Sequence, residues 1–580
     1  MKNILEIRQI IAAAPAGTGE FVPGTVLAGD WCYRDGQSQV KGVPVIPYSW
    51  EDREALRAGR EYTDAIYEAV LDQVVPWLNR VHGLRRETRY WRMIIGYFLL
   101  TYVQILYDRY RSLVATAVGY PLGELAGLHP GAYTTCADGN EFICRAVGDD
   151  ALNLQLFTQL APFVPMCVRV NGFKVQPLSP VPRKPKMAGL RLLLSRFWFR
   201  AAKGRVVFYS TLADRSVVRR LVVRSLFRVV PMTGAHRVRR QQLLDFSTRD
   251  TLATLRGSDG FSTAIFQTLV QNLPFAYLEG FAKLQMEAAT SAQRYLPRAI
   301  VSAVGLYLDP FFAIWAGECV TRGARLIAVQ HGGLYGETRP HNPECYERSI
   351  SDLFVSWGWD NGAGVVPMPA PRLMGIEPSS RRGRRDRVLW VTTEDSRYTP
   401  HLSPVPMGPQ LADYFAAEEK FYGSLESKVR PHILIRLYPK DFGWDRRARW
   451  GSLYPELAID DGVTPIRTLL REAKIAVIDY FGSTVLLEAL AMRIPVLVFG
   501  NPERFRVCEA AVPYYELLRA AGVLHDNPDS AAATLNSIYP DVDRWWSEQH
   551  RQEAVRIFSE HFARTAPDAI AQWVAFARKL

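Results

Sequence analysis

Residues 475–490 read IAVIDYFGSTVLLEAL, the clearest strand–turn–helix pattern in the chain. The run IAVI is short, apolar and rich in β-branched residues, which predicts a buried strand. A glycine and the pair Ser483 and Thr484 follow, and the apolar spacing beyond them predicts a helix. A buried strand that leads directly into a helix is typical of the repeating unit of a parallel α/β sheet.

The same pattern recurs on both sides of this unit. Short apolar runs followed by helical segments occur at residues 299–306, 325–329, 388–392, 432–437 and 495–499. Strands that alternate with helices predict parallel, doubly wound sheets. A stretch rich in proline, glycine and arginine, residues 367–387, separates the two groups, so we expect two α/β domains that face a central cleft.

The first 180 residues have a different character. They begin with short strand-like runs and continue mostly as helices, and the aromatic residues 90–112 are expected to form a buried core helix. We therefore predict an α/β fold of two Rossmann-like domains with an N-terminal helical elaboration. The expected units are residues 1–375, residues 385–540, and C-terminal helices at 541–580 that pack back on the N-terminal domain.

Length and composition exclude several classes of protein. The chain has 580 residues, of which 48% are hydrophobic and 22% charged, so disordered and collagen-like chains are excluded. Its seven cysteines are scattered and form no zinc-binding pattern, which favours a reducing, cytoplasmic location. We expect neither a secretory signal nor a membrane-spanning helix.

Positive charge is concentrated in one segment. The net charge is +12, yet residues 183–240 alone contain sixteen Lys and Arg against a single acid. Four of these arginines recur at helical spacing between apolar residues: Arg215, Arg219, Arg220 and Arg224. Basic amphipathic helices of this kind bind anionic membrane surfaces. A solvated helix face and another polyanion are the alternatives, and no nucleic-acid motif accompanies the charge, so we expect no nucleic-acid partner.

The first of three motifs at strand ends is residues 329–337, VQHGGLYGE. It places His331 beside Gly332 and Gly333, at the edge of a parallel sheet where ligands bind. Glycines let backbone amides approach a ligand closely, and an imidazole can hydrogen-bond to a phosphate. A tight structural turn with an incidental histidine is the alternative interpretation.

The second motif is residues 435–441, IRLYPKD. Arg436 and Lys440 lie there at a strand end, where they can neutralise the phosphate of a nucleotide. Two surface cations in a loop would give the same pattern.

The third motif belongs to residues 475–490. Asp479 ends the strand, and Ser483 and Thr484 start the helix, where free N–H groups and hydroxyls can surround an anion. Glu488 follows one turn later on the same face, from which it can accept hydrogen bonds from a ribose diol. The alternative is an ordinary helix cap with a solvated glutamate.

Taken together, the motifs resemble those of GT-B glycosyltransferases, and specifically the bacterial surface-carbohydrate transferases. The resemblance spans nearly the whole chain. It comprises residues 27–32 (LAGDWC), 90–92 (YWR), 107–110 (YDRY), 330–333 (QHGG), 356–359 (SWGW), 436–439 (RLYP), 479–480 (DY) and 483–488 (STVLLE). The C-terminal half is also similar to the nucleotide domain of bacterial sialyltransferases and Kdo transferases.

That resemblance implies a CMP-activated donor of a 2-keto-3-deoxy sugar acid, either Kdo or a nonulosonate, and a glycan acceptor on a lipid carrier. Those enzymes bind the CMP phosphate with an HP motif, which reads Tyr438-Pro439 here, so Arg436 or Lys440 must replace the histidine. Only one phosphate is neutralised, so no metal or other cofactor is expected. A UDP-sugar or CDP-glycerol donor remains open, as does a non-catalytic scaffold that binds membrane or glycan.

Glycosyl transfer also needs a group that takes the proton of the acceptor hydroxyl. We favour the carboxylate of Asp309, with His331 stabilising developing charge, and with Asp30 and Glu337 as rivals. Asp309 precedes a proline, so it can equally serve only as a helix cap. The expected location is the cytoplasmic face of the inner membrane, with peripheral attachment through residues 183–240.

Overall fold

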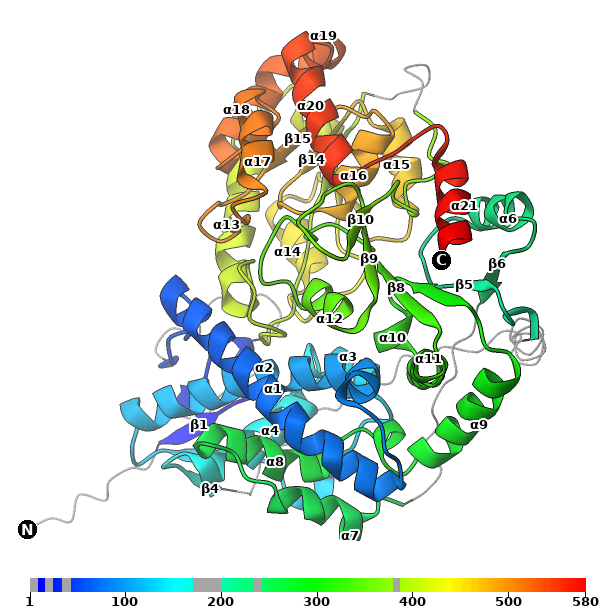
Figure 1. Cartoon of the computed structure of the whole chain (residues 1–580). Coiled ribbons are helices and arrows are strands. Elements are labelled where there is room, and N and C mark those ends of the chain that lie inside the picture. Colours follow the sequence, from blue (N-terminus) through cyan, green and yellow to red (C-terminus); the bar gives the residue numbers. More distant parts are fainter. Residues whose placement is uncertain (1–8, 16–23, 34–42, 170–199, 233–242, 379–385) are drawn as a thin grey trace, which may run out of the picture.

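The computed structural model describes residues 9–15, 24–33, 43–169, 200–232, 243–378 and 386–580 (Figure 1). Three parallel sheets, each covered by helices, organise this part of the chain. In Figure 1 the C-terminal sheet lies in the upper half of the view, the N-terminal helices lie in the lower half, and the middle sheet lies between them. Two stretches of the basic segment, residues 183–199 and 233–240, fall outside the described residues.

The C-terminal sheet has six parallel strands in the order β13-β12-β11-β14-β15-β16. Its strands are β11 (Val388–Val391), β12 (Ile433–Arg436), β13 (Ala458–Asp460), β14 (Ile475–Ile478), β15 (Val496–Phe499) and β16 (Leu524–His525). The strand predictions at 388–392, 432–437 and 495–499 are thereby confirmed. After β11 the chain adds β12 and β13 on one side of it and then returns to add β14 on the other side. The direction of strand addition thus reverses between β11 and β14, which makes this pair a topological switch point.

The middle sheet is also six-stranded and parallel, with the order β10-β9-β8-β7-β5-β6. Its strands are β5 (Val206–Tyr209), β6 (Val229–Met232), β7 (Ala299–Ser302), β8 (Arg325–Val329), β9 (Leu353–Ser356) and β10 (Val365–Pro367). Its switch point lies between β5 and β7. The strand expected at 299–306 ends at Ser302, and a short helix, α10 (Gly305–Leu308), takes up the remainder.

The N-terminal region contains a third sheet in addition to the expected helices. Four strands of three residues each pair in the order β2-β1-β3-β4. They are β1 (Ile10–Ala12), β2 (Thr25–Leu27), β3 (Glu124–Ala126) and β4 (Cys167–Arg169). Runs this short carry too little periodicity to be told from loops, which is why the sequence did not reveal a sheet.

Helices fill the layers between and around the sheets. Those of the N-terminal region are α1 (Arg53–His82), α2 (Thr88–Gly119), α3 (Gly139–Ala146), α4 (Asp150–Leu160), α7 (Phe246–Arg249), α8 (Gly260–Asn272) and α9 (Phe281–Arg294). Most of α2 is buried in one large apolar core, which confirms the core helix expected at 90–112. None of the helices in the described ranges combines the length and hydropathy needed to cross a membrane.

The remaining helices cover the other two sheets. Around the middle sheet lie α6 (Arg215–Arg224), α11 (Pro310–Thr321) and α12 (Asn342–Ile350). Around the C-terminal sheet lie α13 (Leu411–Gly423), α14 (Arg446–Leu453), α15 (Ile466–Glu472), α16 (Thr484–Ala491), α17 (Val512–Ala520), α18 (Pro528–Ile538), α19 (Val542–Trp546) and α20 (Gln549–Phe562). The last helix, α21 (Ala569–Lys579), crosses to the middle sheet and packs against α6.

One segment of the C-terminal domain is buried in the N-terminal region. We refer to residues 395–402 as the crossing segment. Arg397 forms an ion pair with Asp150 at 3.1 Å, and both side chains are only 3% exposed. Arg109 donates to the backbone carbonyl of Thr399 at 2.8 Å, and the ring of Tyr398 is fully buried. These buried polar contacts fix how the two parts of the molecule lie against each other.

Candidate functional site

The loops that carry the first and third motifs touch each other. The backbone N–H of Gly333 donates to Oγ1 of Thr484 at 3.0 Å. A Cβ atom at Gly333 would lie 2.0 Å from the carbonyl oxygen of Gly482, so only glycine permits this approach. A Cβ at Gly332 would lie 2.9 Å from the Thr484 hydroxyl. The loop after β8 and the loop after β14 therefore form one continuous surface between the two domains.

His331 is the exposed end of a hydrogen-bonded relay. Its side chain is 21% exposed, and its Nδ1 lies 2.7 Å from the hydroxyl of Tyr335. That hydroxyl donates to the buried carboxylate of Glu347, on α12, at 2.9 Å. Because Tyr335 has a single hydroxyl proton, the imidazole must donate from Nδ1, which leaves Nε2 as a proton acceptor. Tyr307 lies 3.2 Å from Nε2.

The relay includes residues that the sequence did not single out as functional. Burial raises the pKa of Glu347, and the nearby His331 partly opposes this effect. The Oε1 atom of Glu347 lies 3.5 Å from Nδ1 of His331 and has no hydrogen-bond partner. Glu347 follows His331 by sixteen residues, in the next helix, and no motif marks the pair. The packing of α12 against α2, β8 and β9 brings them together.

Asp309 lies at the switch point of the middle sheet. It is 3% exposed and caps α11 by accepting from the backbone N–H of Phe312 at 3.1 Å. It also accepts from the hydroxyl of Tyr209, the last residue of β5, at 2.6 Å. Burial and the Asp309 charge raise the pKa of Tyr209. The structure therefore shows the capping interaction that the Asp-Pro sequence allowed.

Glu337 is fully buried beneath its loop. Its carboxylate accepts from the hydroxyl of Tyr515, on α17, at 2.5 Å and from the backbone N–H of Leu334 at 3.2 Å. Burial raises its pKa to about 7, and both hydrogen bonds oppose the shift. In this conformation the carboxylate supports the loop and is closed off from the cleft.

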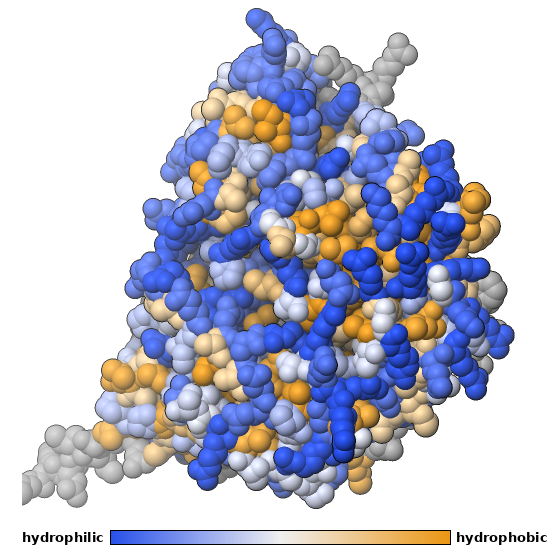
Figure 2. All heavy atoms as spheres, viewed as in Figure 1, coloured by the Kyte–Doolittle hydropathy of each residue, from blue (hydrophilic) through white to orange (hydrophobic). Residues whose placement is uncertain are grey.

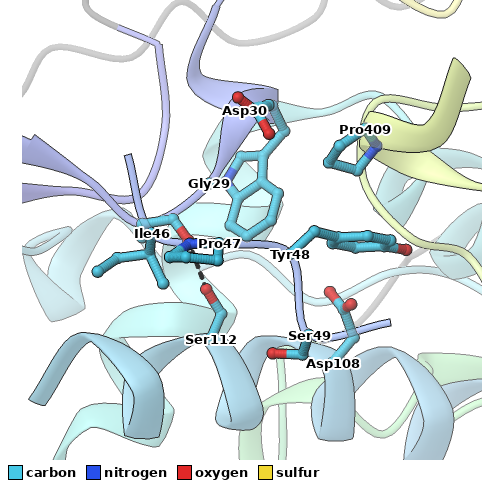
Figure 3. Close-up of a pocket in the computed structure, with 11 residues that line it drawn as sticks. Gly29, Asp30, Ile46, Pro47, Tyr48, Ser49, Asp108, Ser112 and Pro409 are labelled. Carbon is cyan, nitrogen blue, oxygen red and sulfur yellow. Dashed lines mark hydrogen bonds between the residues drawn. The ribbon is translucent and has the colours of Figure 1, made fainter. Parts of the chain in front are cut away.

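Asp30 lies elsewhere, beside a small cavity between the N-terminal sheet and α2 (Figure 3). The cavity has a volume of about 10 Å³, enough for about one water molecule and too small for a sugar. Burial and the charge of Glu51 raise the pKa of Asp30. Ser112 donates to the carbonyl of Ala28 at 2.6 Å and closes one wall.

The two cations of the second motif have different environments. Arg436 is 8% exposed, forms an ion pair with Asp460 and donates to the carbonyl of Gly462 at 2.9 Å. Lys440 is exposed, and its ammonium lies 4.3 Å from the centre of the Phe442 ring. Of the pair, Lys440 is the cation whose charge is open to a ligand.

Ser483 and Glu488 are held by protein partners. Ser483 caps α16 by accepting from the backbone N–H of Val485 at 3.1 Å. Glu488 is 1% exposed and accepts from Arg372 at 2.6 Å and from Arg467 at 3.2 Å. The capping interpretation of Ser483 is confirmed, whereas the solvated glutamate of that alternative is wrong, because Glu488 is buried between two arginines.

A cavity of about 410 Å³ opens at the carboxyl ends of β11, β14, β15 and β16. This is the size of a small-molecule site, and it lies at the switch point of the C-terminal sheet. Aromatic rings and carboxylates share its walls. The lining side chains include Tyr414, Tyr480, Phe481, Phe499 and Phe505, and the acids Glu394, Asp395, Asp413, Asp479 and Asp526.

The cavity is acidic, although the sequence had pointed to a cationic site. Burial raises the pKa of Glu394 to about 7, and burial together with the charge of Glu418 raises that of Asp479. Asp479 accepts from Nε1 of Trp390 at 2.8 Å and from the hydroxyl of Tyr414 at 2.7 Å. Of the five acids, the sequence had identified only Asp479. The others are Glu394 and Asp395 on the loop after β11, Asp413 on α13 and Asp526 after β16, and only the fold brings these elements together.

Few cationic or metal-binding groups accompany these acids. Arg504 lines the cavity but is already paired with Glu51 and Asp413. Burial lowers the pKa of His401, and the charge of Asp395 partly opposes this effect. Among the described residues, no group of three or more His, Cys, Asp or Glu side chains is placed to hold a metal ion.

Two doubly wound parallel domains whose carboxyl edges meet at shared loops have the GT-B arrangement, so the chain has the GT-B fold. The profile of the LIC12162 family transferases matches residues 20–576, and the chain belongs to this family. No curated protein matches the chain.

Several solved structures are similar to this one at low identity. A variant of the wall teichoic acid polymerase TagF is 11% identical, with 67% of this chain and 92% of that chain covered and a TM-score of 0.31. An O-GlcNAc transferase mutant of Thermobaculum terrenum is 13% identical, with 89% of this chain and 97% of that chain covered and a TM-score of 0.33. An α,α-trehalose-phosphate synthase of Burkholderia vietnamiensis is 12% identical, with 65% of this chain and 100% of that chain covered and a TM-score of 0.34.

Proposed function

We propose that this protein transfers a sugar from a nucleotide-activated donor to a glycan acceptor of a bacterial surface polysaccharide. The observation that carries the proposal is the contact between Gly333 and Thr484. It brings a loop with a partly exposed imidazole against the N-terminus of α16, and Leu334 and Gly482 of the same two loops line a cavity large enough for a nucleoside. Glycosyl transfer needs these three features in one place.

In this proposal the nucleoside occupies the acidic cavity. Carboxylates accept hydrogen bonds, so they suit the hydroxyls of a ribose and the amino group of a cytosine. The aromatic side chains of Tyr414 and Phe481 line the cavity, and aromatic rings are groups on which a base can stack. The leaving phosphate then lies outside the cavity, near the positive end of α16, with Lys440 as the exposed cation of the second motif.

His331 acts as the base. The acceptor hydroxyl gives its proton to Nε2 as its oxygen bonds to the anomeric carbon, and the bond between that carbon and the leaving phosphate oxygen breaks. Tyr335 and Glu347 hold the imidazole in the required tautomer and stabilise the imidazolium that forms. We assign the buried Asp309 and Glu337 to the support of α11 and of the glycine loop.

For the donor we propose a CMP-activated 2-keto-3-deoxy sugar acid, Kdo or a nonulosonate. A single phosphate needs little positive charge, and Lys440 is the cation that the second motif leaves open. On the same ground we propose that no metal ion is required, so binding and turnover should persist in EDTA. A UDP-sugar or CDP-glycerol donor is the alternative.

Thermal shifts with CMP, UDP and GDP test the donor. Greater stabilisation by CMP than by UDP or GDP at equal concentration supports the proposal, because a ligand that binds only the folded state stabilises it by RT ln(1 + L/Kd), where L is the free ligand concentration. Comparable stabilisation by UDP would favour a UDP-sugar. No effect of any nucleotide would favour a scaffold that binds glycan or membrane. Mass spectrometry of products formed from a panel of activated donors then identifies the sugar.

We also propose peripheral attachment to the cytoplasmic face of the inner membrane, where a lipid-linked acceptor would be found. The helix α6 is amphipathic, with Val217 and Leu221 buried and with Arg215, Arg219, Arg220 and Arg224 exposed. Each basic residue near an anionic leaflet contributes about 1 kcal/mol. Replacement of the four arginines by glutamine should release the protein from anionic vesicles at ordinary salt.

A further inference from the structure

A row of arginines marks the edge of the middle sheet that is opposite the cleft. Arg228, Arg205 and Arg298 directly precede β6, β5 and β7. Backbone hydrogen bonds join them across the strands: Val206 N–H to Arg228 O at 2.9 Å and Arg298 N–H to Arg205 O at 2.9 Å. Arg325 begins the next strand, β8. Neighbouring strands are about 4.8 Å apart, so the row spans roughly 15 Å.

This row, which we call the arginine edge, is open to solvent. All four side chains are exposed. Within the part of the chain that the structure describes, no acidic residue forms an ion pair with any of them. Like charges on adjacent strands repel one another, and an anionic partner that faced them would remove this repulsion.

Three exposed apolar side chains lie at one end of the arginine edge. Val223, Leu226 and Phe227 are 62%, 75% and 61% exposed, and Phe227 directly precedes Arg228. The backbone of Leu226 and Phe227 has φ values of 52° and 58°, a left-handed conformation that large apolar residues rarely adopt. Figure 2 shows hydrophobic side chains bordered by hydrophilic ones at the margin of the molecule where Figure 1 places α6.

We propose that the arginine edge and the turn at 223–228 are a docking surface for an anionic lipid bilayer. The arginines would lie among the headgroups, and the three apolar side chains would enter the interfacial layer. A nucleic acid or an acidic polysaccharide would match the charge but would offer no apolar layer for Leu226 and Phe227. A bilayer offers both.

This surface also fixes the orientation of the enzyme, and that consequence rests on the proposed glycosyl transfer. All strands of the middle sheet are parallel, so the edge that carries the arginines and the edge that carries His331 are opposite. The five residues of β8 separate them by about 16 Å. The cleft would thus face away from the membrane, and the acceptor must be a preassembled, lipid-linked glycan long enough to reach it.

Flotation with vesicles tests the docking surface. The full chain is mixed with vesicles of phosphatidylcholine alone or with phosphatidylglycerol added, at low and high salt. We expect binding only to the anionic vesicles. Replacing Arg205, Arg228 and Arg298 by glutamine should weaken binding tenfold to about a hundredfold. The variant Leu226→Ser/Phe227→Ser should lose the part of the binding that resists salt.

Matched controls carry the same changes elsewhere. Arg53, Arg85 and Arg471 are exposed arginines outside this surface, and their replacement by glutamine removes the same charge. Val118→Ser/Leu122→Ser removes exposed apolar residues of α2 and the loop after it. Both controls should bind like the wild-type protein. Wild-type binding by the arginine variant, or an equal loss in its control, would overturn the proposal.

Two further measurements separate this inference from the proposed function. If the Leu226/Phe227 change abolishes self-association in sedimentation without vesicles, the turn is a protein contact and the proposal fails. Stabilisation by CMP should be unchanged in all vesicle-binding variants. A wild-type protein that binds vesicles but no nucleotide would refute the donor assignment and leave the docking surface intact.

Discussion

The middle sheet and the C-terminal sheet share a doubly wound topology, but their switch points are occupied differently. At β5/β7 the Tyr209 ring stacks on Phe312 at 3.7 Å, and its hydroxyl binds the buried Asp309. At β11/β14 a cavity of about 410 Å³ remains open. The topology therefore marks where a site can form, and the side chains that follow the strands determine whether it is open.

In the proposed mechanism the two domains have different tasks. The middle domain contributes His331 from the end of β8, and the C-terminal domain contributes the cavity. Substitutions in the first should lower turnover, and substitutions in the second should lower donor affinity.

The largest effect is expected at His331. His331→Ala removes the proton acceptor and should lower turnover about 10²–10⁴-fold while leaving CMP affinity unchanged. Steady-state kinetics and calorimetric titration with CMP measure the two quantities. His550→Ala, an exposed histidine on α20, is the control. Equal losses of turnover and CMP affinity would mean that the imidazole binds phosphate.

The next effect is expected where the two loops meet. Thr484→Val keeps the shape of the side chain but removes the acceptor for Gly333 N–H and a hydroxyl beside the phosphate position. We expect CMP affinity to fall about tenfold, because a hydrogen bond to a charged group is worth roughly 1.5–3 kcal/mol. Thr290→Val, whose hydroxyl bonds only within α9, is the matched control. Undiminished affinity in Thr484→Val would place the phosphate elsewhere.

Glu394 should make stability depend on pH. Its pKa is raised from 4.5 to about 7 by burial, so it destabilises the folded protein progressively as pH rises from about 4.5 through 7. Glu394→Gln removes this loss, and its free energy of unfolding should exceed that of the wild type by about 1–3 kcal/mol at pH 8, with little difference at pH 4. Denaturant unfolding at both pH values gives the comparison. A constant difference would show that Glu394 is not the titrating group.

The smallest effect is expected at the closed switch point. Asp309→Asn weakens a cap and a hydrogen bond, so it should lower the free energy of unfolding by about 1 kcal/mol and leave turnover within about threefold of the wild type. Chemical denaturation and kinetics measure both. A hundredfold loss of turnover with normal stability would instead make Asp309 the base and reverse the roles given to it and to His331.

The sequence predicted six of the twelve strands of the two large sheets, namely β7, β8, β11, β12, β14 and β15, because these are apolar runs of four or five residues beside clear helices. It also placed His331, Gly333 and Thr484 at strand ends, where the structure brings them together. It could not reveal Glu347 or Glu394, because a buried carboxylate acquires its role from neighbours that are distant in sequence. For the same reason the partner of Arg436, Asp460, was missed, although it lies on the adjacent strand.

The crossing segment bears on how this enzyme admits its substrates. A hinge opening between the domains would have to separate Arg397 from Asp150 and break the hydrogen bond from Arg109 to the carbonyl of Thr399. Each of these charge-assisted contacts contributes about 1.5–3 kcal/mol. At their combined cost an open form would make up only about one molecule in a thousand. Small-angle scattering should therefore show the same radius of gyration with and without nucleotide. Donor and product would then pass through a mouth of fixed width, and exchange would be governed by the side chains that line it.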